Sequence, residues 1–192
     1  MPRTREQFAE MKDERKQAIF AAALPLFSVS EKVSIDAICE KAKCSHGIVY
    51  HYFKNVEQIR EKLMNSSTFV EIKHNIFDNL EGSSYEKIEH IIGEMLDVSQ
   101  KNIEKVCYLN ILIKNTEKDS IFSLLTNLIK TAQQASTIKG GDPAEIVNTL
   151  FLLFKGIYLS LILEKHPTSK VPSLETVMQL IRKPNSFYHQ TL

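Results

Sequence analysis

The sequence lacks tryptophan, is poor in glycine and proline, and carries almost no net charge. Six glycines and six prolines in 192 residues exclude a collagen-like or low-complexity chain. The formal net charge of +1 gives no electrostatic argument for a polyanionic partner. It does not exclude one either, because a specific DNA-binding protein needs only a few well-placed cations. Hydrophobic residues make up 43% of the chain, which is enough to build a packed core.

Cysteine and long apolar runs are also scarce. The three cysteines, Cys39, Cys44 and Cys107, are odd in number and lie within apolar patterns. We therefore expect small buried residues in a reducing compartment, not a disulfide framework. The first residues have no apolar core of the kind a signal peptide needs. The longest apolar stretch, 146–163, is interrupted by polar residues, which favours a buried helix of a soluble cytoplasmic protein over a membrane span.

Helical periodicity dominates the whole sequence, and no stretch shows sustained alternation with a period of two. This pattern predicts an all-α protein. A first amphipathic helix is expected to include Phe8 and Phe27, with Pro25 kinking or ending it. Two short helices are expected to follow, with Ser34 and Ser45 as their N-caps.

Longer helices are expected beyond residue 54. Asn55 and Gln58 have the spacing of a capping box, and the apolar face that follows continues to Leu80 as one long helix. Ser83 is expected to cap the next helix. The remaining helices are predicted near 103–114, 122–139, 142–166 and 173–183, and Asp142 followed by Pro143 is the clearest start signal. We therefore predict two domains, 1–54 and 55–192.

Residues 34–53 carry the pattern from which a function can be argued. Two short helices joined by a tight turn form a helix-turn-helix, in which the second helix enters the major groove of DNA. Val49 and Phe53 are expected to face the core, which leaves mostly polar and aromatic side chains exposed on a helix of about two turns. The alternative is an ordinary capped helix pair whose aromatic side chains lie in the core. Against it, Tyr50, His51 and Tyr52 cannot all point inward.

Each candidate DNA-binding residue has a chemical reason to be there. Ser45 and Tyr50 can donate hydrogen bonds to phosphate oxygens, while Gly47 has no side chain and permits close approach. His46, Ile48 and His51 are placed to touch bases, Ile48 through a thymine methyl group. The complete set of predicted DNA-binding residues is Ser34, Lys43, Ser45, His46, Gly47, Ile48, Tyr50, His51, Tyr52 and Lys54.

Residues 15–63 resemble the DNA-binding domain of the tetracycline-repressor (TetR) family. The matching positions are Ile19, Ala22, Ala23, Leu26, Phe27, Ser34, Ile35, Ile38, Ala42, Ser45, Gly47, Val49, Tyr50, Tyr52, Phe53, Glu57 and Ile59. The resemblance implies a homodimer that binds a palindromic double-stranded DNA operator. It also implies release of that operator when a small molecule enters the C-terminal domain, and repression as the family default.

The sequence departs from the family pattern at several positions. The connection 28–33 is about two residues short and lacks the usual glycine. Lys43 replaces the turn glycine, so either a lysine adopts a left-handed conformation or the turn differs. Val56 and Ile48 stand where the family often has lysine and threonine. Phosphate contacts are therefore expected to shift to Lys43, Lys54 and the N-terminal Arg3 and Arg5.

Residues 65–192 show no readable motif, and by analogy they form a helical ligand-binding and dimerisation domain. The helix from Asp142 is apolar nearly all round, so it is expected to be buried on several sides, one of them against a second copy of the chain. Helix 173–183 would complete that interface; the alternative is a monomer with an unusually apolar central helix. Candidate lining residues for an apolar or amphipathic effector are Met95, Tyr108, Ile111, Phe122, Asn148, Phe151 and Phe154.

Other functional classes find less support in the sequence. It contains no recognisable nucleophile–base pair, glycine-rich phosphate loop or metal-ligand spacing, so no enzyme activity, cofactor or metal site is expected. The near-zero charge together with Val56, Lys43 and Ile48 keeps a second hypothesis open. In it, the chain is a helical ligand-binding or interaction protein without sequence-specific DNA binding.

Overall fold

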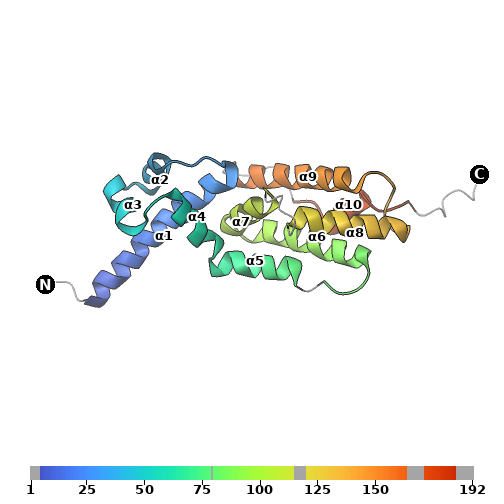
Figure 1. Cartoon of the computed structure of the whole chain (residues 1–192), viewed down its shortest axis with the longest axis horizontal. Helices are drawn as coiled ribbons and strands as arrows, with labels where there is room; N and C mark the ends of the chain where they lie inside the picture. Colours follow the sequence, from blue (N-terminus) through green and yellow to red (C-terminus); the bar gives the residue numbers. More distant parts are fainter. Residues whose placement is uncertain (1–4, 79, 115–119, 164–170, 185–192) are drawn as a thin grey trace, which may run out of the picture. The chain divides into compact units, whose positions relative to one another are not determined.

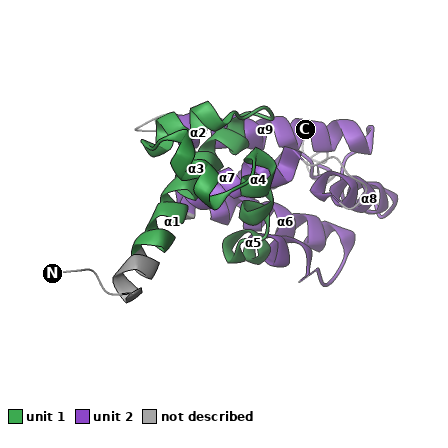
Figure 2. Cartoon of the chain, turned by 60° about the vertical axis from the view of Figure 1, so that its left-hand side comes forward, with its two compact units in different colours: residues 1–71 green, residues 72–192 purple. Residues whose placement is uncertain are grey.

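The chain folds into α-helices, as the sequence predicts (Figure 1). The computed structural model describes residues 5–78, 80–114, 120–163 and 171–184, with side chains from residue 11 onward except Lys101. Within these ranges there are ten helices and no strand; the one isolated β-bridge joins Ile138 and Arg182. The chain divides into two compact units, Met1–Glu71 and Ile72–Leu192 (Figure 2). The predicted boundary at residue 54 remains a prediction.

The first unit contains α1 (Arg5–Val29), α2 (Ile35–Ala42), α3 (His46–Tyr52), α4 (Val56–Met64) and the start of α5 (Ser67–Phe77). Helix α1 packs against α2 and α4, and α2 packs against α3. The small core they enclose is apolar and almost solvent-free; it contains Ile19, Ala23, Phe27, Ile38, Val49, Phe53, Ile59 and Leu63. Burying these side chains stabilises the unit by about 1.5–3 kcal/mol for each large one.

The structure excludes one of the two effects expected of Pro25 and shows that the expectation of a single helix from Asn55 to Leu80 was wrong. Pro25 does not end α1, which continues one further turn to Val29, with the Ser28 hydroxyl donating to the Pro25 carbonyl at 2.8 Å. The predicted helix from Asn55 to Leu80 is broken at Asn65 and Ser66. The Ser66 hydroxyl accepts a hydrogen bond from the Phe69 N–H at 3.3 Å and so starts a new helix. The apolar period continues across the break, which hid it in the sequence.

The short connection between α1 and α2 is held by side chains rather than by a glycine turn. Arg60 of α4 donates a hydrogen bond to the Glu31 carbonyl at 2.9 Å, and its guanidinium lies 4.4 Å from the centroid of the Phe27 ring. The Ser30 hydroxyl donates to the Lys32 carbonyl at 3.0 Å. A single α4 residue therefore ties the connection to the core.

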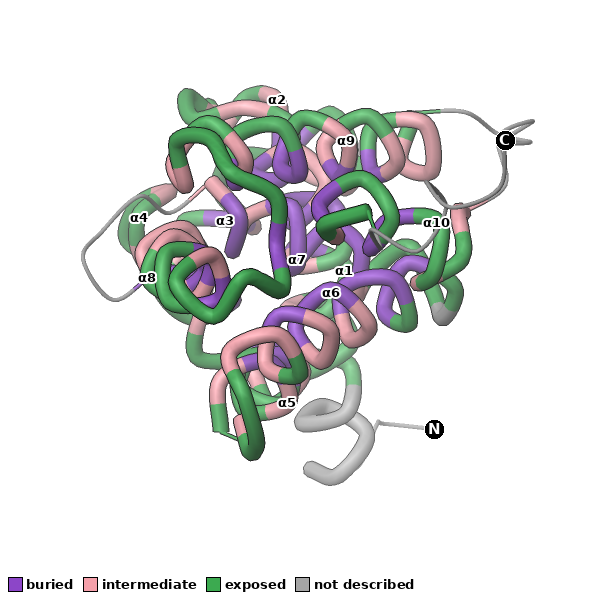
Figure 3. The backbone as a smooth tube through the Cα atoms, turned by 90° about the vertical axis from the view of Figure 1, so that its right-hand side faces the viewer, coloured by how far each residue is buried: buried purple, intermediate pink, exposed green. Residues whose placement is uncertain are grey.

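The second unit contains the end of α5 and the helices α6 (Ser84–Lys101), α7 (Ile103–Lys114), α8 (Ile121–Gln134), α9 (Pro143–Leu163) and α10 (Leu174–Gln179). Helix α6 packs against α7, α8 and α10, while α9 packs against α7 and α8. The buried segments of these helices face one another inside the bundle (Figure 3). This core includes Ile88, Ile92, Met95, Leu109, Leu125, Ile129, Leu150, Phe154 and Tyr158.

Helix ends in the second unit follow the local signals with some exceptions. Ser83 and Glu86 form the predicted capping box, and the Asp142 carboxylate accepts a hydrogen bond from the Ala144 N–H at 2.8 Å. The predicted helix 173–183 is only the six residues of α10, because the following segment turns to pair with 137–139 through the Lys139 N–H and the Ile181 carbonyl at 3.0 Å. The predicted continuation of α9 past Leu163 lies outside the described residues.

Candidate nucleic-acid interface

Helices α2 and α3 form a helix-turn-helix with the predicted caps. The Ser34 hydroxyl accepts a hydrogen bond from the Ala37 N–H at 3.1 Å and starts α2. At its end, Lys43 lies in the left-handed region with φ 50° and ψ 48°. The Lys43 N–H donates to the Glu40 carbonyl at 3.2 Å, and the Cys44 N–H to the Cys39 carbonyl at 3.0 Å. These two bonds are the Schellman motif, which turns the chain from α2 into α3.

Lys43 settles one question that the sequence left open: a non-glycine residue does take the left-handed conformation here. We predict that Lys43→Gly raises the free energy of unfolding by up to about 1 kcal/mol, because it removes the Cβ penalty of that conformation. The matched control is Lys43→Ala, which removes the charge and keeps the penalty. Thermal unfolding of both variants checks this. A Gly variant no more stable than the Ala variant would contradict it.

The scaffold that holds α3 is buried as expected. Val49 has no exposed surface and Phe53 only 2%, and the Phe53 ring lies 5.2 Å from that of Phe20 on α1, measured between centroids. Ile38 of α2 is also fully buried. These contacts fix which face of α3 points inward and therefore which face is presented to a partner.

The opposite face of α3 is exposed and carries most of the predicted contact residues. His46, Gly47, Tyr50 and His51 are exposed, Tyr50 to 56%. Ile48 and Tyr52 are half-buried, and the Tyr52 ring packs edge-on against His51 at 4.9 Å between centroids. The structure therefore brings together a narrow polar and aromatic face, with Ile48 less accessible than the other candidates.

Ser45 occupies the N-cap position of α3 but makes no side-chain capping bond. Its carbonyl accepts from the N–H groups of Ile48 and Val49 at 3.0 and 3.3 Å, so the helix starts there without using the hydroxyl. A serine hydroxyl that the helix does not use can donate to a phosphate oxygen. The docking role of Ser45 stays a prediction.

Sequence reasoning missed the partner of His46. Its Nε2 lies 2.8 Å from the Asp36 carboxylate of α2, and both side chains are largely exposed. The sequence indicated only that Asp36 favours the dipole of α2; the turn geometry brings it beside the first residue of α3. An exposed pair of this kind is worth less than about 1 kcal/mol, so its effect is to orient the imidazole.

The structure describes the side chains of only two of the four predicted phosphate-binding cations. Lys43 and Lys54 are exposed on either side of α3 in the sequence, whereas Val56 is half-buried at the start of α4. The Asn55 side chain caps α4 through the Gln58 N–H at 2.9 Å, but the Gln58 side chain accepts from the Lys54 N–H at 2.7 Å instead of closing the predicted box on Asn55. Arg3 lies outside the described residues, as does the side chain of Arg5 at the start of α1.

The candidate pocket residues of the second unit do not all lie together. Met95, Tyr108, Phe151 and Phe154 are buried, Ile111 and Phe122 are half-buried, and Asn148 is exposed on the outer face of α9. The Phe122 and Phe151 rings meet at 5.8 Å and the Phe154 and Tyr158 rings at 5.7 Å, measured between centroids. Burial raises the pKa of Tyr158 well above its usual value, and a hydrogen bond with Ser99 opposes this shift less strongly.

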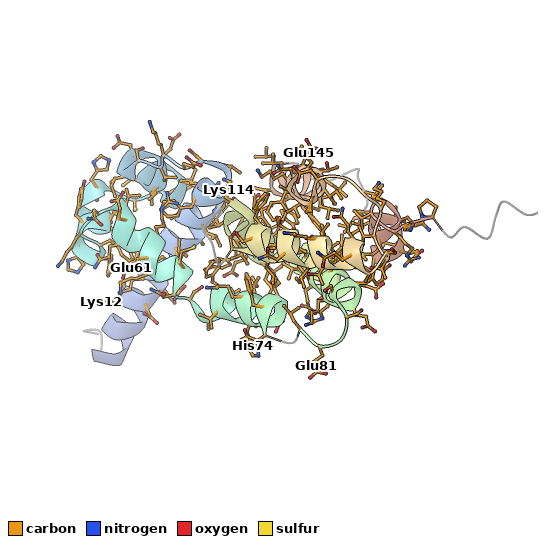
Figure 4. All side chains as sticks on the ribbon, turned by 45° about the vertical axis from the view of Figure 1, so that its right-hand side comes forward. Lys12, Glu61, His74, Glu81, Lys114 and Glu145 are labelled. Carbon is orange, nitrogen blue, oxygen red and sulfur yellow. The ribbon has the colours of Figure 1, made fainter. Side chains whose placement is uncertain are left out.

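Helix α9 buries one face in the bundle of its own chain and leaves the opposite face exposed in the single chain, and burial of that second face against another copy stays a prediction. Val147, Leu150, Phe151, Phe154 and Tyr158 point into the bundle. The opposite face starts at Glu145, which points outward (Figure 4), and continues with Asn148, Thr149, Leu152, Gly156, Leu159 and Leu163. Leu152 is 69% and Leu163 67% exposed, so the last three turns present an uncovered apolar stripe.

Two other kinds of site are a metal-binding cluster and a membrane-spanning helix. Among the described residues, no three His, Cys, Asp or Glu side chains lie close enough together to hold a metal ion. By length and composition alone, α9 could cross a membrane, although 28% of its most apolar window is buried within the chain. A core helix of a soluble protein passes the same test.

Comparison with known proteins places the fold. No protein-family model and no curated protein sequence matches the chain. The solved structure of apo AibR matches it with a TM-score of 0.58 and 16% identity, covering 86% of this chain and 95% of that one. NalD of Pseudomonas aeruginosa, the secondary repressor of the MexAB-OprM multidrug efflux pump, matches with a TM-score of 0.54 and 15% identity, covering 90% and 99%.

A third match comes from another organism. The ketosteroid transcriptional regulator KstR2 of Mycobacterium tuberculosis has a TM-score of 0.56 and 11% identity, covering 88% of this chain and 95% of that one. AibR has also been solved in complex with isovaleryl coenzyme A and operator DNA. The chain therefore shares its all-α fold with AibR, NalD and KstR2, and in this chain the helix-turn-helix of α2 and α3 precedes the helices of the second unit.

Proposed function

We propose that the chain is a transcriptional regulator of the TetR type that binds a palindromic DNA operator through α3 and releases it when a small molecule binds the second unit. The observation that carries this proposal is the exposed face of α3, where His46, Gly47, Tyr50 and His51 are displayed on a helix anchored by Val49 and Phe53. This polar and aromatic face points away from the core of its own unit and does not contribute to it. Its side chains can form hydrogen bonds and apolar contacts with base edges and hydrogen bonds with phosphates.

The second unit supplies the reasons to propose an effector and a dimer. Its two aromatic pairs, Phe122 with Phe151 and Phe154 with Tyr158, offer an apolar environment for an apolar or amphipathic small molecule. The apolar stripe of α9 fits a second copy of the chain, with Leu180 of α10 as a further exposed apolar residue. Repression in the cytoplasm is part of the same proposal. Among proteins of this fold, NalD is a repressor, and AibR has been solved with operator DNA and isovaleryl coenzyme A.

Selection from random double-stranded DNA tests the proposed function. The purified chain should enrich a palindromic sequence, and its affinity for that sequence should fall steeply as salt concentration rises, because phosphate contacts release counterions. Enrichment of one sequence, together with release of the chain from that sequence by small apolar acids or thioesters, would support the complete proposal. Failure to enrich any sequence would favour the helical ligand-binding or interaction protein instead.

Substitution of Gly47 tests whether α3 approaches DNA closely, separately from any change in stability. A Cβ added there would meet only the Ser45 hydroxyl, at 3.9 Å, so Gly47→Ala fits the free protein. It should leave stability unchanged or raise it by up to about 1 kcal/mol, since glycine weakens helices. The same methyl group would meet DNA, and we expect operator affinity to fall by about 1–3 kcal/mol, the usual cost of overpacking.

Circular dichroism with thermal unfolding and fluorescence anisotropy with the selected operator measure the two effects separately. Gly140→Ala is the matched control, because a Cβ there meets nothing within 4 Å and the residue lies outside α3. Unchanged operator affinity of Gly47→Ala would mean that α3 does not approach DNA closely at this position.

A further inference from the structure

Two thiols meet at the turn of the helix-turn-helix. Cys39 lies in the last turn of α2 and Cys44 two residues beyond its end. The Schellman motif places these two positions side by side: the Cys44 N–H bonds the Cys39 carbonyl at 3.0 Å, and Lys43 reverses the chain between them. Both cysteines are free thiols, and Cys44 is close enough to influence the ionisation of Cys39.

The two thiols differ in exposure. Cys39 is 6% exposed and belongs to the core of the first unit, whereas Cys44 is half-exposed on the turn. Burial raises the pKa of Cys39, with the neighbouring Cys44 contributing in the same direction, so Cys39 stays a protonated thiol at neutral pH. A dissolved oxidant therefore reaches Cys44 first, while Cys39 lies beside Cys44 on the core side of the turn.

We propose that Cys39 and Cys44 form an oxidation-sensitive pair that a peroxide closes to a disulfide, and that closure weakens DNA binding by α3. The second half of this inference rests on the proposed function. A disulfide in a reducing compartment is transient, which suits a sensor and not a structural bond.

The chemistry balances with a peroxide as the only added reactant. The Cys44 thiolate attacks one peroxide oxygen, so that an S–O bond forms, the O–O bond breaks and hydroxide leaves as water after protonation. The Cys39 sulfur then attacks the Cys44 sulfur, so that the S–S bond forms and the S–O bond breaks, and the Cys39 thiol proton passes to the departing hydroxide, which leaves as a second water. The two cysteines lose two electrons and two protons, and the peroxide is reduced to two waters.

Closure reaches α3 through Ser45. The S–S bond is about 2.05 Å long, much shorter than the contact distance of two separate sulfur atoms, and its preferred dihedral restricts both side chains, so we expect closure to pull the turn toward α2. Ser45 follows Cys44 directly, and its carbonyl holds the first N–H groups of α3, those of Ile48 and Val49. Moving the turn therefore changes the angle between α2 and α3 and displaces His46 from Asp36.

Treatment of the full-length protein with hydrogen peroxide tests the proposal through two separate readouts. Intact mass should fall by two hydrogen atoms in a chain that stays monomeric on a non-reducing gel, and a phosphine reductant should reverse the change. Affinity for the selected operator should fall at least about tenfold, the loss expected for one good base contact, and recover on reduction.

Two variants control the experiment. Cys44→Ser, at a half-exposed position, should fold normally, keep its operator affinity and lose both responses to peroxide. Cys107→Ala removes the third cysteine, in the other unit, and should keep both responses. A peroxide response in Cys44→Ser would overturn the assignment to this pair.

The remaining outcomes separate the two halves of the inference. A wild-type chain in which Cys39 or Cys44 gains oxygen atoms, or in which both stay free thiols, would overturn the disulfide. A disulfide that leaves operator affinity unchanged would overturn the coupling to α3 while the DNA-binding proposal stands. A reduced chain that binds no operator would overturn the proposed function, and loss of the two hydrogens would still support the oxidation-sensitive pair.

Discussion

Replacement of Tyr50 and His51 by alanine is expected to abolish sequence-specific DNA binding while the protein remains folded. Both side chains are exposed on α3, and Tyr50 exposes 56% of its surface. Surface substitutions of this kind change stability by about 0.5 kcal/mol or less. The edge-on contact of His51 with Tyr52 is lost, but alanine is the better helix former, which offsets that loss.

The expected effect on binding is large because two kinds of contact disappear. The Tyr50 hydroxyl is assigned to a phosphate and the His51 ring to a base edge, and each base contact is worth about 1–3 kcal/mol of discrimination. Fluorescence anisotropy with the selected operator and with a scrambled duplex measures the difference. The variant should bind both duplexes equally weakly, with the salt dependence of nonspecific binding.

Two further variants make this result interpretable. Val70→Ala, which removes a 55% exposed side chain of α5, is the control and should keep full operator affinity. Tyr50→Phe removes only the hydroxyl and should weaken specific and nonspecific binding to the same degree. Intact operator affinity in the double variant would show that α3 does not read the operator with these residues.

Replacement of Leu152 and Leu159 by glutamate is expected to convert a dimer into a folded monomer. Both leucines lie on the outer face of α9 and are 69% and 39% exposed in the single chain, so the substitutions leave the bundle core intact. Burying the exposed surface of these leucines on both protomers, equal to about one leucine for each, contributes roughly 3–6 kcal/mol to the dimer. Their loss should therefore raise the dissociation constant of the dimer at least about a hundredfold.

Sedimentation analysis over a range of protein concentrations measures this change. Ile103→Glu is the matched control, since Ile103 is 47% exposed on α7 of the same unit and lies outside the stripe. The monomeric variant should also bind a palindromic operator more weakly than the wild type, because its two half-sites are no longer held by one dimer. A wild-type chain that is monomeric, or a double variant that remains dimeric, would overturn this assignment.

The wild-type chain and the double variant also test whether the apolar stripe of α9 binds a membrane. A wild-type chain that partitions onto phospholipid vesicles, and a double variant that does not, would assign the apolar stripe to lipid instead. The Tyr158 hydroxyl, fully buried near the Met95 carbonyl at 3.5 Å, ties the opposite face of α9 into the helical bundle. Dimerisation needs no loss of that packing, whereas insertion across a membrane would expose it.

Much of the site could be predicted from the sequence because it depends on short-range signals. The caps at Ser34, Ser83 and Asp142 involve residues two or three positions apart, so their spacing is visible in the chain itself. The inward positions of Val49 and Phe53 follow from a helical period on a helix of only two turns. Once those two residues face the core, the outward positions of Tyr50 and His51 follow.

The break at Asn65 and Ser66 and the length of α10 show where short-range signals fail. Apolar residues kept the helical period across the break, so periodicity alone predicted one helix. The end of α10 is decided by pairing with residues about forty positions earlier in the chain, through the Lys139 N–H and the Ile181 carbonyl. No local pattern carries that information.

By itself, the sequence determined that the chain is helical, where most of its helices begin, and which residues α3 presents. Only the tertiary structure decided that Lys43 is left-handed, that Asp36 holds His46, that the turn brings Cys44 back to the Cys39 carbonyl, and that α9 leaves Leu152 and Leu163 uncovered in the single chain. The physical reason is the same in each case. Periodicity fixes a face relative to its own helix axis, whereas contacts between helices depend on the turn that joins them and on which neighbour covers each face.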